Sequence, residues 1–300
     1  VSWTMLEEST SMGYGKLAVQ FEVSSGTGIP ESAGVTVSQI QADLQSTLAV
    51  QTASFQEDYS LTTSFISNVT DALDKANDYA DTVTDAVAFV GQTTDELTNL
   101  ATQITSFKTG LSSIIAAPDK LITAINNVFN TVDNLFDSPN DTLKAYQNMF
   151  GYGDSDITLD LDNPINNERT ANRSAMNSVV NLSALAGAYL AASQIQSTTV
   201  QEIDAISESL DAQYESVYSS AQTPVEVKTS LAVARVTVRE FLNTQRLTAA
   251  EIVQTYVNIT PARLISFNYY NDSTRGLEIS KLNEQYDMSF IEGNIDILSE

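Results

Sequence analysis

The sequence predicts a mainly α-helical protein with small β elements at its two ends. Over most of residues 31–257, apolar side chains recur at three- and four-residue steps, which is the spacing of one face of an α-helix. Residues 1–30 include a stretch in which apolar and polar side chains alternate, as they do on a strand. Residues 258–300 combine short helices with a closing strand. We therefore expect a β-hairpin, an elongated helical region and a small C-terminal module.

The first region is predicted to be a β-hairpin at the end of a larger β domain. Four apolar residues alternate with polar or small ones: Leu17, Val19, Phe21 and Val23. Gly13-Tyr14-Gly15 marks the turn before them. Because a lone hairpin is marginally stable in water, its sheet partners must come from another chain or from residues outside this sequence. We accordingly expect the sequence to be a fragment of a longer protein.

The helical region is expected to contain several helices that pack on one another. Pro118 and Pro164 stand where proline favours a helix start, and the Ser138–Asp141 stretch is predicted to end a helix. An unbroken helix of ~50 residues would be about 75 Å long, so such segments must fold back as hairpins or pair with neighbouring subunits. The pattern ends with Ile252, Tyr256 and Val257.

The most apolar window of the chain, Ala184–Ala192, lies inside this helical region. It is far shorter than the roughly 20 residues that span a bilayer. We therefore expect a buried helix segment and no membrane partner.

The C-terminal module begins with a short helix that is predicted to end near Tyr269 and Tyr270. Asn271 and Asp272 suit a turn, and Ser273 or Thr274 is expected to cap a second helix by accepting hydrogen bonds from its free N–H groups.

The second helix of the module takes its apolar residues from three positions: Leu277, Ile279 and Leu282. Asn283 suits the end of that helix. After a loop, the apolar positions Ile295, Ile297 and Leu298 predict a short closing strand.

Two segments carry a resemblance to a known family. Ile265–Asp272 and Glu278–Asn283 resemble the C-terminal end of the Mu-like DNA-circularisation protein family, where a Leu-Ala-Tyr-Arg-Leu-Tyr-Gly-Asp type run leads to an Ile-Val-x-x-Asn run. Lys16–Ser24 is similar to the hairpin that ends the family's N-terminal β domain. The module as a whole resembles the small LysM-like module of phage baseplate proteins.

The resemblance implies a structural role in a tailed-phage virion, where the tail tube meets the baseplate of a contractile tail. The partners would be other tail and baseplate proteins, and a hexameric ring is expected because tail tubes of this group have sixfold symmetry. The LysM-like module would serve as a packing adapter, so the chain would act by assembly and not as an enzyme.

Composition leaves few catalytic options. The 300 residues include neither cysteine nor histidine, so disulfides, His-ligated metals and triads with a histidine base are excluded. Residues 151–162 hold four aspartates, but they do not fit an EF-hand, and a solvated connector is the favoured interpretation over a calcium loop. We expect no cofactor and no metal.

The net charge of −24 argues against direct, tight nucleic-acid binding, which needs clustered Lys and Arg. The densest basic stretch holds Arg235, Arg239 and Arg246, interleaved with apolar residues. Arginines at this spacing are typical of a helix surface.

Interface candidates are the residue types that are enriched in binding hot spots. They are Trp3, Tyr14, Tyr269, Tyr270 and Arg275, together with Phe21 of the hairpin and Asn283 of the module. Packing of Trp3 and Tyr269 inside their own units is the alternative. Two other functions stay open at this point: a secreted helical coiled-coil effector or adhesin, and a glycan-binding module.

Overall fold

The computed structural model describes residues 35–90, 94–153, 163–196, 199–221, 223–285 and 287–299. The hairpin that we predict for residues 1–30 lies outside them. The described residues form two hydrophobic cores, one made by the helices of residues 37–246 and one within residues 252–298. The expectation of a mainly α-helical protein with small β elements is confirmed.

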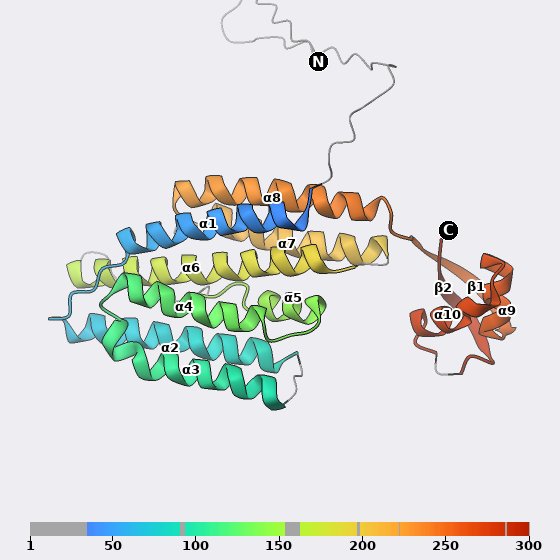
Figure 1. Cartoon of the computed structure of the whole chain (residues 1–300), viewed down its shortest axis with the longest axis horizontal. Helices are drawn as coiled ribbons and strands as arrows, with labels where there is room; N and C mark the ends of the chain where they lie inside the picture. The colour runs from blue at the N-terminus through green and yellow to red at the C-terminus, as the bar shows by residue number, and fades with distance from the viewer. Residues whose placement is uncertain are drawn as a thin grey trace, which may run out of the picture. The chain divides into compact units, whose positions relative to one another are not determined.

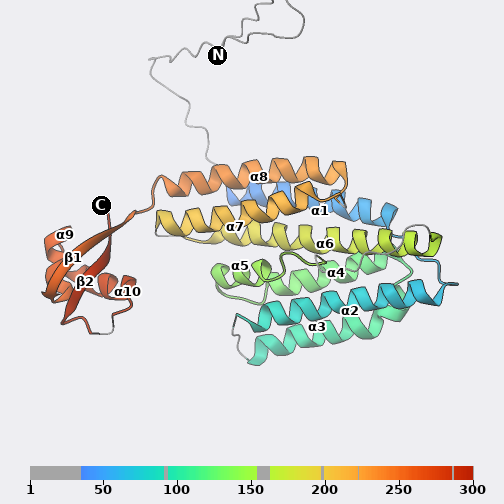
Figure 2. The ribbon, with the colours of Figure 1, turned by 180° about the vertical axis from the view of Figure 1, so that it is seen from behind.

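The helices of the first core lie side by side in one bundle (Figures 1 and 2). Their bounds are α1 (Val37–Asp58), α2 (Ile66–Ala88), α3 (Thr94–Ile114), α4 (Pro118–Asp133), α5 (Pro139–Gln147), α6 (Pro164–Gln194), α7 (Val200–Ser219) and α8 (Val225–Arg246). The predicted helix starts at Pro118 and Pro164 are confirmed, and each proline occupies the first turn.

Helix α6 is the central element of the bundle and contacts α1, α2, α4, α5, α7 and α8. Asn163 caps its start by accepting from the N–H of Ile165 at 3.0 Å. The Ala184–Ala192 segment is almost wholly buried, as predicted. By length and composition α6 would pass as a membrane span, but most of its apolar segment is buried among the other helices, as in the core helix of a bundle.

Small residues on α6 let large neighbours approach its backbone. A Cβ atom added to Gly187 would lie 2.3 Å from the ring of Tyr146 on α5, so only glycine fits there. Tyr79 of α2 lies at the centre of an aromatic cluster, with ring centroids 5.6 Å from Phe107 and Phe129 and 6.5 Å from Tyr152. Side chains from four parts of the sequence thus meet in one core.

Helix ends differ from the sequence expectation at two places. Ser138–Asp141 does follow the end of a helix, but Pro139 also starts α5, which the periodicity did not reveal because α5 has only nine residues. The apolar residues that recur at helical spacing after Pro164, from Val179 to Val217, are divided between α6 and α7. Thr199 explains the new start, because its side chain accepts from the N–H of Glu202 and caps α7.

The C-terminal module runs strand, helix, helix, strand. Its elements are β1 (Ile252–Thr260), α9 (Ala262–Tyr270), the 3-10 turn η1 (Ser273–Arg275), α10 (Gly276–Leu282) and β2 (Ile291–Leu298). β1 and β2 form an antiparallel pair with Thr255 opposite Ile295, and the register shifts between Val257 and Thr260. Seven buried residues form the core: Ala262, Ile265, Tyr270, Ile279, Ile291, Ile295 and Ile297. The predicted closing strand is confirmed.

Two expectations about the module were wrong. Ile252, Tyr256 and Val257 lie on strand β1 and not in a helix, so β1 crosses the boundary that we placed after residue 257. The cap after the turn is Asp272, whose carboxylate accepts from the N–H of Thr274 at 2.8 Å, instead of Ser273 or Thr274. Asn271 does form the predicted turn, in the left-handed region with φ of 50°.

Candidate interaction surface of the C-terminal module

Tyr270 and Arg275 are placed together by the turn between α9 and α10. Tyr270 is buried, and its hydroxyl accepts from the N–H of Leu298 at 2.8 Å. The guanidinium of Arg275 stacks on the Tyr270 ring at 3.6 Å and forms an ion pair with Glu278 at 2.9 Å. These contacts join α9, α10 and β2, so the side chains of both residues make stabilising contacts within the module.

Asn283 ends α10 and fixes β2 against it. Its side-chain amide donates to the backbone carbonyls of Ile279 and Asp296, each at 2.8 Å, and its side-chain oxygen accepts from the N–H of Asp296 at 2.7 Å. One side chain thereby replaces the backbone partners that a third strand would supply. This set of bonds gives Asn283 a structural role inside the module.

Tyr269 is the predicted interface residue that the structure leaves most exposed, at 44%. Its hydroxyl lies 2.7 Å from the side-chain oxygen of Thr255 on β1, so the ring is held at the surface. Trp3, Tyr14 and Phe21 lie outside the described residues. For all these residues, an interface role stays a prediction.

The module has an apolar surface that the sequence did not reveal. Nine of its described large apolar side chains are 41–67% exposed: Val253, Tyr256, Ile259, Leu264, Phe267, Tyr269, Leu277, Met288 and Phe290. We call these residues the apolar surface of the module. Scattered exposed apolar residues are normal, whereas a contiguous group of them is typical of interaction sites.

Backbone contacts gather part of this surface at one end of the module. The N–H of Ala262, the first residue of α9, donates to the carbonyl of Met288 at 2.8 Å, and Thr260 pairs with Ile291. Met288 and Phe290 therefore lie beside the start of α9. Leu264 and Phe267 are three residues apart on α9 and share its outer face.

Most cations of the described part are already paired with acids. Nine Lys and Arg side chains there make ion pairs, among them Arg235, which contacts both Asp211 and Glu215 at 3.0 Å. Arg239 shares Asp211 with Arg235. The arginines of α8 are thus neutralised by acids of α7, which leaves little positive surface for phosphates.

A buried ion cluster ties α6 to α2. Asp71 accepts from Arg169 at 2.7 Å and also from Arg173. Burial alone would raise the pKa of Asp71, but the hydrogen bonds from Arg173 and Arg169 outweigh it, and the pKa lies below its ordinary value. The carboxylate therefore stays ionised, which gives this cluster a structural role in the bundle.

The described residues contain no group of three or more acidic, His or Cys side chains that could hold a metal ion. Residues 154–162, which carry the four aspartates, lie outside the described part. A scan against models of known protein families finds no match to the chain, and no curated protein matches it.

Proposed function

We propose that the chain is a structural protein that acts by assembly, with the apolar surface of its C-terminal module as the docking site for a protein partner. The observation that carries the proposal is the exposure of nine large apolar side chains in the module's described part. Burial of such side chains stabilises a complex by about 25 cal/mol per Å² of apolar area, before the cost of association.

More narrowly, we propose a tail component of a tailed phage, at the junction of the tail tube and the baseplate. The order strand, helix, helix, strand supports this, because it gives the LysM-like module both of its strands. The resemblance of segments at both ends to the Mu-like DNA-circularisation family is the reason for placing the chain in a phage tail. Partners would be neighbouring tail proteins, and a hexameric ring remains part of the proposal.

Particle composition tests the narrow proposal. Intact virions of the phage that encodes the chain are purified and digested, and their peptides are quantified by mass spectrometry. We expect this chain in every particle at a few copies per tail. Its absence from particles, with secretion into the culture fluid, would instead indicate a secreted effector.

Substitution of the apolar surface tests the docking role. We expect the double variant L264S/F267S to fold but to be missing from assembled particles. The control is V225S, which replaces a valine that is 71% exposed on α8 in the bundle. Normal incorporation of L264S/F267S would remove α9 from the docking site. Retention of the wild-type chain on peptidoglycan, lost in the variant, would favour glycan binding instead.

A further inference from the structure

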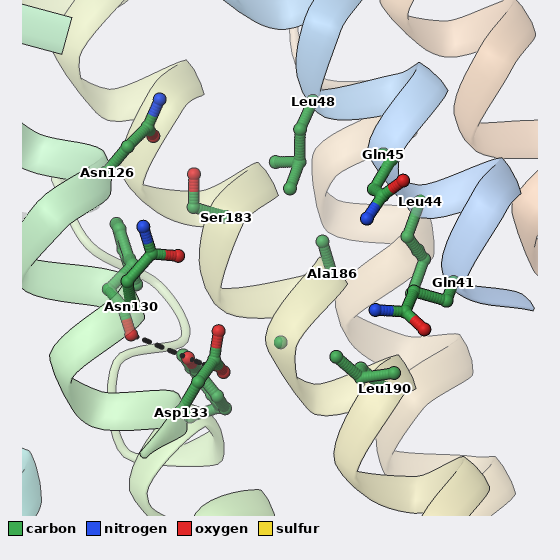
Figure 3. A pocket seen from close by; sticks show the side chains of 13 residues that line it. Gln41, Leu44, Gln45, Leu48, Asn126, Asn130, Asp133, Ser183, Ala186 and Leu190 are labelled. Atoms are coloured by element: carbon green, nitrogen blue, oxygen red, sulfur yellow. Dashed lines mark hydrogen bonds between the residues drawn. The ribbon is translucent and has the colours of Figure 1, made fainter. Parts of the chain in front are cut away.

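The bundle contains a pocket of about 340 Å³ between α1, α4 and α6, with Tyr146 of α5 at one end. Each of the three helices contributes residues at i, i+3, i+4 and i+7, which places one face of each helix along the pocket for two turns. Helix α6 forms the floor with the small residues Ser183, Ala186 and Gly187. Figure 3 shows α4 on one side of this floor and α1 on the other.

Six polar side chains line the pocket besides Tyr146: Gln41, Gln45, Asn126, Asn130, Asp133 and Ser183. Asp133 is the charged one among them, and Ser183 is the most buried. Ser183 is 7% exposed, its hydroxyl makes no hydrogen bond within the described part, and it points into the pocket (Figure 3). One carboxylate oxygen of Asp133 accepts from the Tyr146 hydroxyl, and the other has no hydrogen-bond partner among the described residues.

Asp133 is an exposed residue, but one oxygen of its carboxylate accepts from the hydroxyl of the buried Tyr146. The protein atoms around the carboxylate raise the pKa of Asp133, and the hydrogen bond from Tyr146 opposes the effect only in part. A positively charged group in the pocket would pair with the second carboxylate oxygen.

Size and charge restrict the occupant. The pocket has the volume of a small-molecule site, and α1 also contacts α4 directly, so a helix with a diameter of about 10 Å does not fit. No lining side chain is basic, and the chain carries a net charge of −24, which disfavours an anion. Leu44, Leu48 and Leu190 offer apolar contacts.

We propose that this pocket binds a small organic ammonium compound. The ammonium group lies at the Asp133 carboxylate beside Tyr146, whereas Ser183 lies further along the α6 floor, beside Asn126 (Figure 3). The apolar body of the ligand packs against Leu44 and Leu48. The site is separate from the docking surface of the C-terminal module. The proposal of a ligand site therefore does not depend on the proposed function.

The test uses 2-phenylethylamine as the probe and 2-phenylethanol as its uncharged counterpart, each titrated into the full chain and followed by NMR. We expect the amine to bind in the millimolar range or tighter, about tenfold more tightly than the alcohol. D133N should remove this preference while leaving the affinity for the alcohol unchanged, because asparagine still accepts from Tyr146.

Two further variants complete the test. D137N removes an exposed carboxylate outside the pocket lining and should leave the tenfold preference intact. S183A changes the floor away from the carboxylate, so it should also leave the preference for the amine intact (Figure 3). Equal affinity for amine and alcohol, binding of neither probe, or an undiminished preference in D133N would each overturn the proposal.

Discussion

The bundle and the C-terminal module differ in how many of their large apolar side chains are exposed. Across residues 35–249, the described exposed large apolar residues are eight: Phe65, Ile66, Phe89, Tyr218, Val225, Val233, Val236 and Leu247. Within residues 252–298 there are nine, around a core of only seven buried residues. The bundle therefore buries apolar surface within itself, whereas the module keeps much of it available. This difference in exposure is the basis of the roles that we propose, the bundle as a scaffold and the module as a contact surface.

The largest effect should come from breaking the close packing of the bundle. G187A places a methyl group where the Tyr146 ring lies 2.3 Å away, and Tyr146 is fixed between α4 and α6. We expect a loss of about 3 kcal/mol or more in the free energy of unfolding, measured by chemical denaturation.

The control for this variant is G110A on α3, where an added Cβ atom meets nothing within 4 Å. Alanine is favoured over glycine inside a helix, so G110A should stabilise the bundle by about 0.5–1 kcal/mol. Equal effects of the two variants would show that packing against Tyr146 does not limit the position.

The next effect concerns the ion cluster of the bundle. D71N leaves Arg169 and Arg173 without their shared carboxylate, although both are only about a fifth exposed. We expect a loss of about 2 kcal/mol at neutral pH, less than for a fully buried pair.

The stability difference between D71N and the wild type should depend on pH. Because the pKa of Asp71 is lower in the folded chain than in the unfolded chain, its stabilisation is complete above the unfolded value of about 4. It is lost as the pH falls through the folded value. The difference between D71N and the wild type should therefore shrink in acid, and a difference that is constant with pH would contradict the assignment.

A smaller effect is expected for a hydrogen-bonding side chain of the module. N283A removes the two hydrogen bonds that hold β2 to α10 and a third within α10, which should destabilise the module by about 1–2 kcal/mol. Hydrogen exchange should then quicken for the amides of β1 and β2, with no change in the core of the bundle. N268A, at an exposed position of α9, is the control.

Faster exchange throughout the N283A variant would show that the two cores unfold together. Two hydrogen bonds offer a route for such coupling: the side chain of Gln201 on α7 accepts from the N–H of Ile252 at 3.1 Å and donates to its carbonyl at 3.3 Å.

The sequence predicted the helical class and the helix starts at Pro118 and Pro164, because a proline marks the first turn of a helix locally. It also predicted the turn at Asn271 and Asp272, but not the starts of α5 and α7. Strand β1 was missed because the spacing of Ile252, Tyr256 and Val257 also fits a helix. What decides its conformation is pairing with β2, about forty residues further along the chain, together with its many β-branched residues.

The candidate surface was harder to predict than the fold. Residue type alone nominated Tyr270, Arg275 and Asn283, all of which make contacts inside the module. Leu264 and Phe267 were not nominated, because an apolar residue on a helix is ordinarily assigned to a core. Only the packing of α9 shows which of its apolar residues face inward.

The smallest effect on stability is expected for a substitution on the outer face of α9. It can be compared directly with a substitution on the buried face of the same helix. Phe267 is 52% exposed, whereas Ile265, two residues earlier, is 1% exposed in the module's core. F267S should change the free energy of unfolding of the module by at most about 0.5 kcal/mol, as is usual for surface positions. I265S should cost about 3 kcal/mol, because it leaves a cavity and buries a hydroxyl group.

Both α9 variants are best measured at several protein concentrations. If F267S destabilises the module as much as I265S does, and more strongly at high concentration, Phe267 is covered by a second copy of the chain. The module would then be a self-association element. An effect near zero at every concentration leaves the side chain free for a different protein, which is what a contact surface carried by a self-sufficient scaffold requires.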